Sequence, residues 1–180
     1  LLVAGAKGGL IHADTHRASP RVDEIPFASE HMFHATLHDA QTGRVIYKVG
    51  AVERLLERCA DALDEQGRVV ALDPAAVHRA VEAMAARGLR VLAFVRRHVD
   101  AGHTKLEHHH VAAGLTFLGL QGMIDPPRAE AIEAVRQCQA AGIAVKMITG
   151  DHLVTARAIA EQIGLKGHEM AGKLIAISGR

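Results

Sequence analysis

The chain has 180 residues, enough for one large domain or two small ones with a buried core. Its composition is 49% hydrophobic but only 3% aromatic, so the core is expected to be aliphatic. The net charge of +1 gives no electrostatic reason to expect nucleic acid or an anionic membrane surface as a partner. The apolar run over residues 111–124 is too short and too interrupted by glycine to span a bilayer, so no direct membrane contact is predicted.

The cysteines indicate the compartment in which the protein resides, and the two ends of the chain indicate whether it is a fragment. Cys59 and Cys138 are far apart and form no paired motif, which is typical of reduced, buried thiols in a cytosolic domain. Residues 1–7 form an apolar, helix-like run without an N-cap, and residues 173–178 form a possible strand or helix with nothing after it. We therefore expect a fragment of a longer protein.

The first part of the chain has the pattern of an antiparallel sheet. Residues 21–27 and 33–39 are predicted to be extended. Residues 39–43 supply turn chemistry, and residues 44–49 are predicted to form a returning strand. This hairpin pattern predicts an α+β domain when it is combined with the helices that follow.

Helices and strands alternate in the next stretch. A helix over residues 52–63 is predicted by the helical spacing of Val52, Leu55, Leu56, Cys59 and Leu63. A second helix is predicted to start at Asp73-Pro74, which make an N-cap and first-turn pair, and to end at Gly88. The following residues predict a short strand, a polar surface loop and a buried strand, over residues 89–95, 96–110 and 115–123.

The predicted polar loop is rich in histidine, which raises the question of a metal site at His103, His108, His109 and His110. Without cysteine or carboxylate partners in a zinc-like pattern, such a loop is more typical of a solvated surface segment. Two other histidine pairs are four residues apart, His12/His16 and His34/His38, but the second pair lies on a predicted strand. No metal site is predicted.

A double proline divides the chain. Asp125-Pro126-Pro127-Arg128 fixes φ twice and removes two backbone donors, so a sheet cannot continue through it and a stiff hinge is predicted. Beyond it, a helix from Arg128 to Gly142, a buried strand over residues 143–148 and a helix over residues 153–163 alternate as in a parallel α/β sheet. We therefore predict two domains, residues 1–121 and 122–180, joined through a hinge at residues 122–128.

The turn Thr149-Gly150-Asp151 stands between the predicted strand and the last helix. In open α/β sheets, ligands bind where a strand leads into a helix N-terminus, whose unpaired N–H groups attract anions. Thr149 offers a hydroxyl, Gly150 permits close backbone approach, and Asp151 can cap the helix or lie near a metal. The turn indicates a phosphate site, or a strand–helix turn with an aspartate cap.

Several motifs in a fixed order resemble the P-type cation-transporting ATPases, and the type II branch in particular. In the second part of the chain these are residues 122–128, 147–152 and 155–160. Upstream, residues 25–30 resemble the nucleotide-domain segment whose phenylalanine stacks on adenine. Residues 48–55 resemble the Lys-Gly-Ala-Pro-Glu segment, and residues 88–93 resemble the segment whose arginine reaches the ATP phosphates.

The resemblance implies a fold and an activity. It implies an α+β nucleotide-binding domain, joined to part of an α/β domain of the haloacid-dehalogenase-like (Rossmann-like) type. It also implies ATP and Mg²⁺ as cofactors, and ATP hydrolysis through an aspartyl phosphate that drives cation transport. The fragment would lie on the cytoplasmic side of a membrane, with the actuator, phosphorylation and transmembrane parts of the pump as partners.

The resemblance also assigns roles to residues of this chain. Nucleotide contacts are implied for Phe27, Lys48, Gly50, Arg90 and Asp125, with Phe27 stacking on adenine and Arg90 neutralising phosphate charge. Thr149, Gly150 and Asp151 are implied to hold the transferring phosphoryl group. Considered without the resemblance, Phe27 could be a core residue, Arg90 a solvated side chain and Asp125 a helix cap.

The chain departs from the family pattern at several positions. Lysine directly precedes Gly-Ala-Pro-Glu in the family, whereas this chain has Val49 there and Lys48 one place earlier; Met32 replaces another frequent lysine. A shift of one residue on a strand points the side chain to the opposite face unless a bulge intervenes, so weakened ATP affinity is expected. The Asp-Lys-Thr-Gly-Thr segment with the phosphorylated aspartate and the later Gly-Asp-Gly-x-Asn-Asp segment are absent, so the chain alone should not turn over ATP.

Two other functions are weighed against the pump assignment. A degenerate or non-catalytic interaction module is suggested by Val49 and Met32, and it predicts no saturable ATP binding. A stand-alone phosphatase of the haloacid-dehalogenase type is less favoured, because its Asp-x-Asp nucleophile motif does not occur in this chain.

Overall fold

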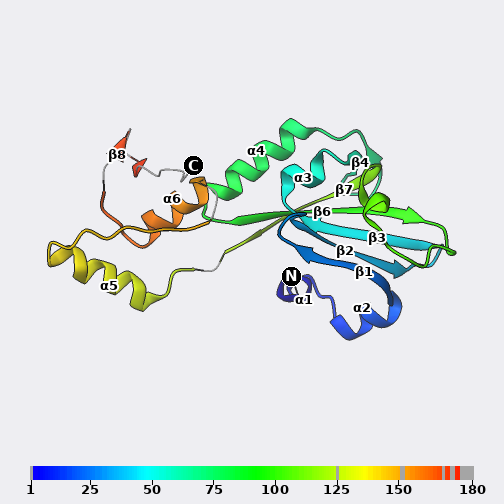
Figure 1. The fold of residues 1–180 in the computed structure, drawn as a ribbon, viewed down its shortest axis with the longest axis horizontal. Coiled ribbons are helices and arrows are strands. Elements are labelled where there is room, and N and C mark those ends of the chain that lie inside the picture. Colours follow the sequence, from blue (N-terminus) through cyan, green and yellow to red (C-terminus); the bar gives the residue numbers. More distant parts are fainter. Residues whose placement is uncertain (1, 125, 151–152, 168, 171–172, 175–180) are drawn as a thin grey trace. The chain divides into compact units, whose positions relative to one another are not determined.

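The structure is a computed structural model that describes residues 2–124, 126–150, 153–167, 169–170 and 173–174 (Figure 1). The chain forms two compact units. The first comprises Leu1–Asp73 and Leu92–Gln121, and the second comprises Pro74–Val91 and Gly122–Arg180. Within the described part of the chain, no helix has the length and apolar character needed to cross a bilayer.

The first unit contains most of a mixed seven-stranded sheet, in which β1, β2, β3 and β6 lie side by side in Figure 1. By the bounds above, Arg90 and Val91 of β6 and Gly122 and Met123 of β7 belong to the second unit. The strand order is β1-β2-β3-β6-β7-β4-β5. The consecutive pairs from β1 to β3 are antiparallel, as is β3 with β6, whereas β4 runs parallel to β7. The strands are β1 Arg21–Ala28, β2 Phe33–Asp39, β3 Arg44–Gly50, β4 Cys59–Leu63, β5 Val69–Val70, β6 Arg90–Val99 and β7 Leu115–Met123.

The register of β2, β3 and β6 determines which side chains enter the core. Paired residues share a face, and the pairs Leu37↔Ile46 and Ala35↔Lys48, which are two residues apart on each strand, lie on the same face. Val95 of β6 pairs with Lys48 from the other side. All of these side chains are buried, so Lys48 lies on the apolar face of the sheet.

Short helices complete the first unit: α1 Leu2–Lys7, α2 His12–Ala18, α3 Val52–Leu56 and the 3₁₀ turn η1 His108–Val111. The predicted helix over residues 52–63 is wrong beyond Leu56, because residues 59–63 form β4 instead. β4 pairs with β5 on one side and with β7 on the other. The ladder with β7 joins residues that are distant in sequence, and the two ladders together outweigh the helical spacing of the apolar side chains.

The strand β6 extends further than predicted, because the loop begins only after Val99. Residues 96–99 pair with residues 44–47 of β3, in the register Arg44↔Val99 to Tyr47↔Arg96. A polar sequence can continue an antiparallel strand when its neighbour supplies the hydrogen bonds, so polarity alone was a poor guide to the end of the strand.

The second unit contains three longer helices and a two-stranded hairpin: α4 Pro74–Ala85, α5 Ala129–Ala140, α6 Leu153–Gln162, β8 Glu169–Met170 and β9 Lys173–Leu174. As predicted, α4 begins at Pro74 and its chain turns at Gly88, which has a φ of +77°. A Cβ atom added at Gly88 would lie 3.6 Å from the Cβ atom of Ala158 in α6, so the two helices approach closely there.

The predicted buried strand over residues 143–148 is not present. These residues have no regular secondary structure, and Ile143 and Ile148 are 56% and 98% exposed. A parallel strand needs neighbouring strands, and the described part of this unit offers only the short β8–β9 hairpin. An apolar run without a sheet to join therefore stays exposed. The α/β sheet of a haloacid-dehalogenase-like domain is not seen in the described residues, whereas α5 and α6 form as predicted.

Candidate functional site

Phe27 is an exposed aromatic residue near the end of β1. Its side chain is 63% exposed, although Ile25, two residues earlier, is buried. The β1–β2 register shifts between Ile25 and Ala28, and this irregularity interrupts the strand alternation at Phe27. An exposed ring of this kind offers a flat apolar surface on which a planar base can stack.

The turn that follows Phe27 is closed by backbone hydrogen bonds and packs against the end of β3. The Met32 N–H donates to the Ala28 carbonyl oxygen at 2.8 Å, and Met32 has a φ of +55°, which is unusual for a residue other than glycine. The Ala51 N–H donates to the Met32 carbonyl at 3.1 Å. A Cβ atom added at Gly50 would lie 2.3 Å from that same carbonyl oxygen, so only glycine fits there.

Lys48 lies inside the core of the first unit. Its side chain is 1% exposed, and its ammonium group donates to the Val111 carbonyl at 3.0 Å. The same nitrogen lies 3.9 Å from the centroid of the Phe33 ring. Burial, followed by repulsion from Arg58, lowers the pKa of Lys48 to about 8. Val49 points to the opposite face of β3, beside its pairing partners His34 and Phe94.

Two further side chains border Lys48. Arg58 also donates to the Val111 carbonyl, at 3.4 Å, and the Cys59 thiol donates to the Leu55 carbonyl at 3.2 Å. Burial and nearby Asp61 raise the pKa of Cys59 to about 11, so this thiol is protonated at neutral pH. Sequence reasoning missed this cluster; its one local signal is a lysine at a core position of an alternating strand.

The remaining predicted site residues lie in the second unit. Arg90 is exposed at the first position of β6, and Thr149 and Gly150 are exposed just before α6. A Cβ atom added at Gly150 would meet no heavy atom within 4 Å, so this backbone is open to approach. Asp125 and Asp151 lie outside the described residues. Of the predicted contacts, the structure brings together Lys48 and Gly50, on one face of β3.

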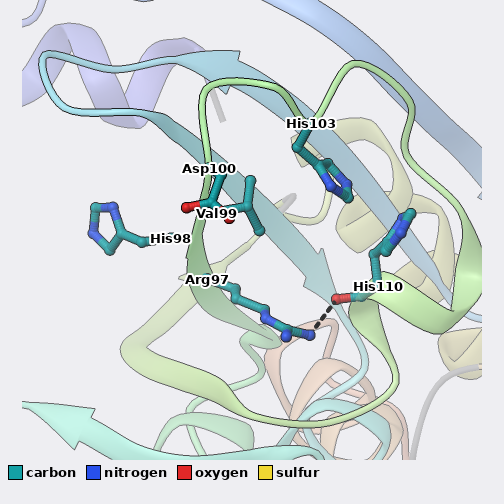
Figure 2. A pocket seen from close by; sticks show the side chains of 6 residues that line it. All are labelled: Arg97, His98, Val99, Asp100, His103 and His110. Carbon is teal, nitrogen blue, oxygen red and sulfur yellow. Dashed lines mark hydrogen bonds between the residues drawn. The ribbon is translucent and has the colours of Figure 1, made fainter.

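A cavity of about 470 Å³ in the first unit involves none of these predicted residues. Figure 2 shows the six residues that line it: Arg97, His98, Val99, Asp100, His103 and His110. His103 and His110, two of the histidines for which a metal site was considered and not predicted, thus lie close together. Nevertheless, among the residues that the structure describes, no group of three or more His, Cys, Asp or Glu side chains is arranged to hold a metal ion.

Comparison with known proteins places the chain in a family. Residues 1–130 match the family described as P-type ATPase, cytoplasmic domain N. The whole chain is 49% identical to the cation-transporting ATPase pma1 of Synechocystis sp., of which it covers 19%. Over 165 residues, or 92% of the chain, it is 44% identical to the probable cation-transporting ATPase F of Mycobacterium tuberculosis, of which it covers 18%.

A human relative is more distant. In an alignment of 160 positions that covers 82% of the chain, it is 38% identical to the human sodium/potassium-transporting ATPase subunit alpha-2, of which it covers 16%. The chain thus spans less than one fifth of the length of each of these relatives. The family match covers more than half of the chain, and the resemblance noted in its sequence motifs is confirmed. This chain belongs to the P-type cation-transporting ATPases and contains sequence of their cytoplasmic domain N.

Proposed function

We propose that this chain is the ATP-binding part of a pump that uses ATP hydrolysis to move a cation across a membrane. The family match supports the general activity, since the relatives are named as cation-transporting ATPases. The observation that carries the nucleotide assignment is the exposed ring of Phe27, in the segment that resembles the adenine-binding segment of the family. ATP, Mg²⁺ and the rest of the pump are the partners in this proposal, and the chain would act on the cytoplasmic side of the membrane.

The base would stack on Phe27. Base–aromatic stacking is worth about 1–3 kcal/mol by alanine substitution, enough to dominate a weak nucleotide site. The tight contact of Gly50 with the Met32 carbonyl holds the end of β3 against the turn after Phe27. Lys48 would support this turn from the buried face, through Phe33 and Val111, rather than contact the phosphates.

The negative charge of the phosphates would be neutralised by residues other than Lys48. Arg90 is exposed and can donate two parallel hydrogen bonds to a phosphate group. Thr149 and Gly150 offer a hydroxyl and an open backbone to a transferring phosphoryl group, and the predicted roles of Asp125 and Asp151 remain proposals. No described cluster suits a metal ion, so Mg²⁺ would be held mainly by the nucleotide phosphates.

The organisation of the parent pump is part of the proposal. Residues 1–121 would form the nucleotide-binding domain, and residues 122–180 would form part of the phosphorylation domain, entered through residues 122–128. The chain lacks the motif of the phosphorylated aspartate, so it would bind nucleotide without turning it over. A bound γ-phosphate would be passed to an aspartate in the remainder of the pump.

One observation favours a second candidate, a nucleotide domain that has lost its ligand and acts only in protein contacts. The lysine of the phosphate-binding pattern is buried at position 48, and an uncharged residue, Val49, points to the other face. Such a module would show no saturable ATP binding.

A titration of the 180-residue chain with ATP and with a fluorescent ATP analogue separates the two candidates. We expect saturable binding that is weakened about tenfold or more by Phe27→Ala, the effect of losing one stacked base. The matched control is Val69→Ala, because Val69 is equally exposed, at 63%, on the two-residue strand β5. Binding that is indifferent to Phe27→Ala would overturn the stacking role, and the absence of saturable binding would support the interaction module.

A further inference from the structure

The segment between β6 and the end of η1, residues 100–111, is here named the histidine strap. It contains His103, His108, His109 and His110. It carries two buried apolar side chains, Leu106 and Val111, into the core of the first unit. The strap is therefore anchored in the core at these two positions, although most of its other side chains are exposed.

Side chains from the sheet and from the region of α3 hold the backbone of the strap. Arg44 donates to the His103 carbonyl at 2.6 Å, and the Leu106 N–H donates to the Asp23 carboxylate at 2.7 Å. Arg97 donates to the His110 carbonyl at 3.1 Å, as the dashed line in Figure 2 shows. Lys48 and Arg58 both donate to the Val111 carbonyl. The position of the strap thus depends on hydrogen bonds along its whole length.

One of the strap's own hydrogen bonds requires a neutral imidazole. The backbone N–H of Glu107 donates to the Nδ1 atom of His110 at 3.0 Å, while the Glu107 side chain accepts from the backbone N–H of His110. A backbone N–H can only donate, so Nδ1 must present a lone pair and the ring must carry its proton on Nε2. A second proton, on Nδ1, would place two donors against each other and break this reciprocal cap of η1.

The surroundings of His110 also oppose protonation. The His103 ring lies edge-on to it at 4.1 Å between centroids, and the His109 ring lies at 3.8 Å. The Nε2 atom of His103 is buried and has no hydrogen-bond partner in the described part of the chain. Burial, and then the neighbouring His103 and His109, lower the pKa of His110. Two charged rings at these distances would repel one another in a site that is partly shielded from water.

The other charged groups near His110 come from the strap and from β6. Glu107 attracts a proton to His110, but its carboxylate also lies 3.3 Å from the Nδ1 atom of His109. The charge of Arg97 disfavours a second proton on His110. Asp100 and His98 line the same cavity. The balance of these groups lowers the pKa, so the strap in place binds protons less well than a released strap.

A second pair of histidines links the strap to the turn after β1. The ring of His108 lies 4.5 Å from the ring of His31, and 5.9 Å from the ring of Phe33. His31 lies in the turn between β1 and β2, which is closed by its N–H bond to the Ala28 carbonyl. These ring contacts join the strap to the turn.

We propose that the histidine strap is a pH-sensitive clasp, held against the sheet while the imidazole of His110 is neutral and released when that ring takes up a second proton. The sign follows from linkage: the released strap binds more protons, so the attachment is complete above the ordinary histidine pKa of about 6.5 and weakens as the pH falls below it. Release frees the Val111 carbonyl, so Lys48 and Arg58 lose their shared acceptor. It also uncovers Phe33.

Hydrogen–deuterium exchange of the whole chain, followed by mass spectrometry without nucleotide, tests the clasp. After correction for the intrinsic pH dependence of exchange, we expect peptides from residues 100–114 to lose protection severalfold between pH 7.5 and pH 5.5, while β2 and β3 keep theirs. Equal protection of the strap at both pH values would overturn the proposal. Because no nucleotide is present, the result does not depend on the proposed ATP site.

A matched pair of variants identifies the responsible ring. In His110→Asn the amide oxygen can still accept from the Glu107 N–H but does not titrate, so we expect a smaller loss of protection at pH 5.5 than in the wild type. His12→Asn, on the exposed helix α2, should behave like the wild type. An unchanged pH response in His110→Asn would contradict the role of His110.

A second measurement is needed if the His110→Asn variant has already lost protection of the strap at pH 7.5. In the wild type at this pH, ¹⁵N spectra of the imidazole rings should show the Nε2–H tautomer for His110. The Nδ1–H tautomer would overturn the proposal.

Discussion

The ammonium nitrogen of Lys48 lies 3.0 Å from the carbonyl oxygen of Val111, in the core between β3 and the end of η1. The Phe33 ring lies beneath it at 3.9 Å, and no described carboxylate forms an ion pair with it. A buried lysine without a counter-ion keeps its charge at a cost, which the carbonyl and the ring offset only in part. In this respect the chain differs from the nucleotide-binding segment that its sequence resembles, because Lys48 lies in the core.

Replacing Lys48 by methionine should stabilise the chain at neutral pH and remove the rise in its free energy of unfolding above pH 8. The pKa of Lys48 is lowered to about 8 in the folded chain, whereas an unfolded lysine has its ordinary pKa of 10.5. The folded wild type therefore loses a proton that the unfolded chain retains, and its stability rises with pH above 8. That rise should amount to about 2 kcal/mol between pH 7 and pH 9.5.

Urea unfolding at the two pH values measures this difference. Lys48→Met should be more stable than the wild type at pH 7, and its advantage should shrink by about 2 kcal/mol at pH 9.5. Groups common to both chains, such as the Cys59 thiol, cancel to first order in the difference. Lys7→Met, in the exposed helix α1, should show no such change. A constant difference between Lys48→Met and the wild type would show that Lys48 titrates normally.

Replacing Gly50 by alanine should destabilise the first unit. Its Cβ atom would lie 2.3 Å from the Met32 carbonyl oxygen and 2.8 Å from the Phe33 Cβ atom, so β3 or the turn must move. Overpacking of this kind costs about 1–3 kcal/mol. The measurement is the urea midpoint at constant m-value, with Gly102→Ala as the control because a Cβ atom there meets nothing within 4 Å. Equal stability of the two variants would contradict the close approach at Gly50.

Exchanging residues 48 and 49 should strengthen ATP binding. Lys48→Val fills a core position between Ala35 and Val95, and Val49→Lys places a cation on the opposite face beside His34. One new charge-assisted hydrogen bond to phosphate is worth about 1.5 kcal/mol, or roughly tenfold in affinity. The same ATP titration checks this expectation, with Lys48→Val alone as the control. Equal affinity of the single and double variants would show that the phosphates do not reach this face of β3.

Local patterns were sufficient to predict much of the fold. The strands β1, β2 and β3 were predicted from turn residues and extended segments, and they form over nearly the predicted ranges. The helix α4 was predicted from Asp73-Pro74 and Gly88. These signals lie within a few residues of the structure that they determine, which is why one sequence was enough.

The errors all concern segments whose structure depends on distant partners. Residues 59–63 form a strand because the distant strand β7, together with the nearby β5, supplies backbone hydrogen bonds, although their apolar spacing fits a helix. Residues 143–148 have the composition of a buried strand but no described sheet to join, and Ile148 is 98% exposed. Helical or alternating periodicity reports which side of an element is apolar, not whether a neighbour is there to cover it.

The sequence by itself was enough to recognise the family, because several short motifs between Phe27 and Gly150 resemble those of one family in the same order, whatever the contacts between them. It also determined that a lysine shifted by one place on β3 changes face, since side chains alternate along a strand. Only the tertiary structure decided what that lysine does. Its acceptor, Val111, is 63 residues away, and the histidine strap that brings this carbonyl into the core is held by side chains from several separate strands.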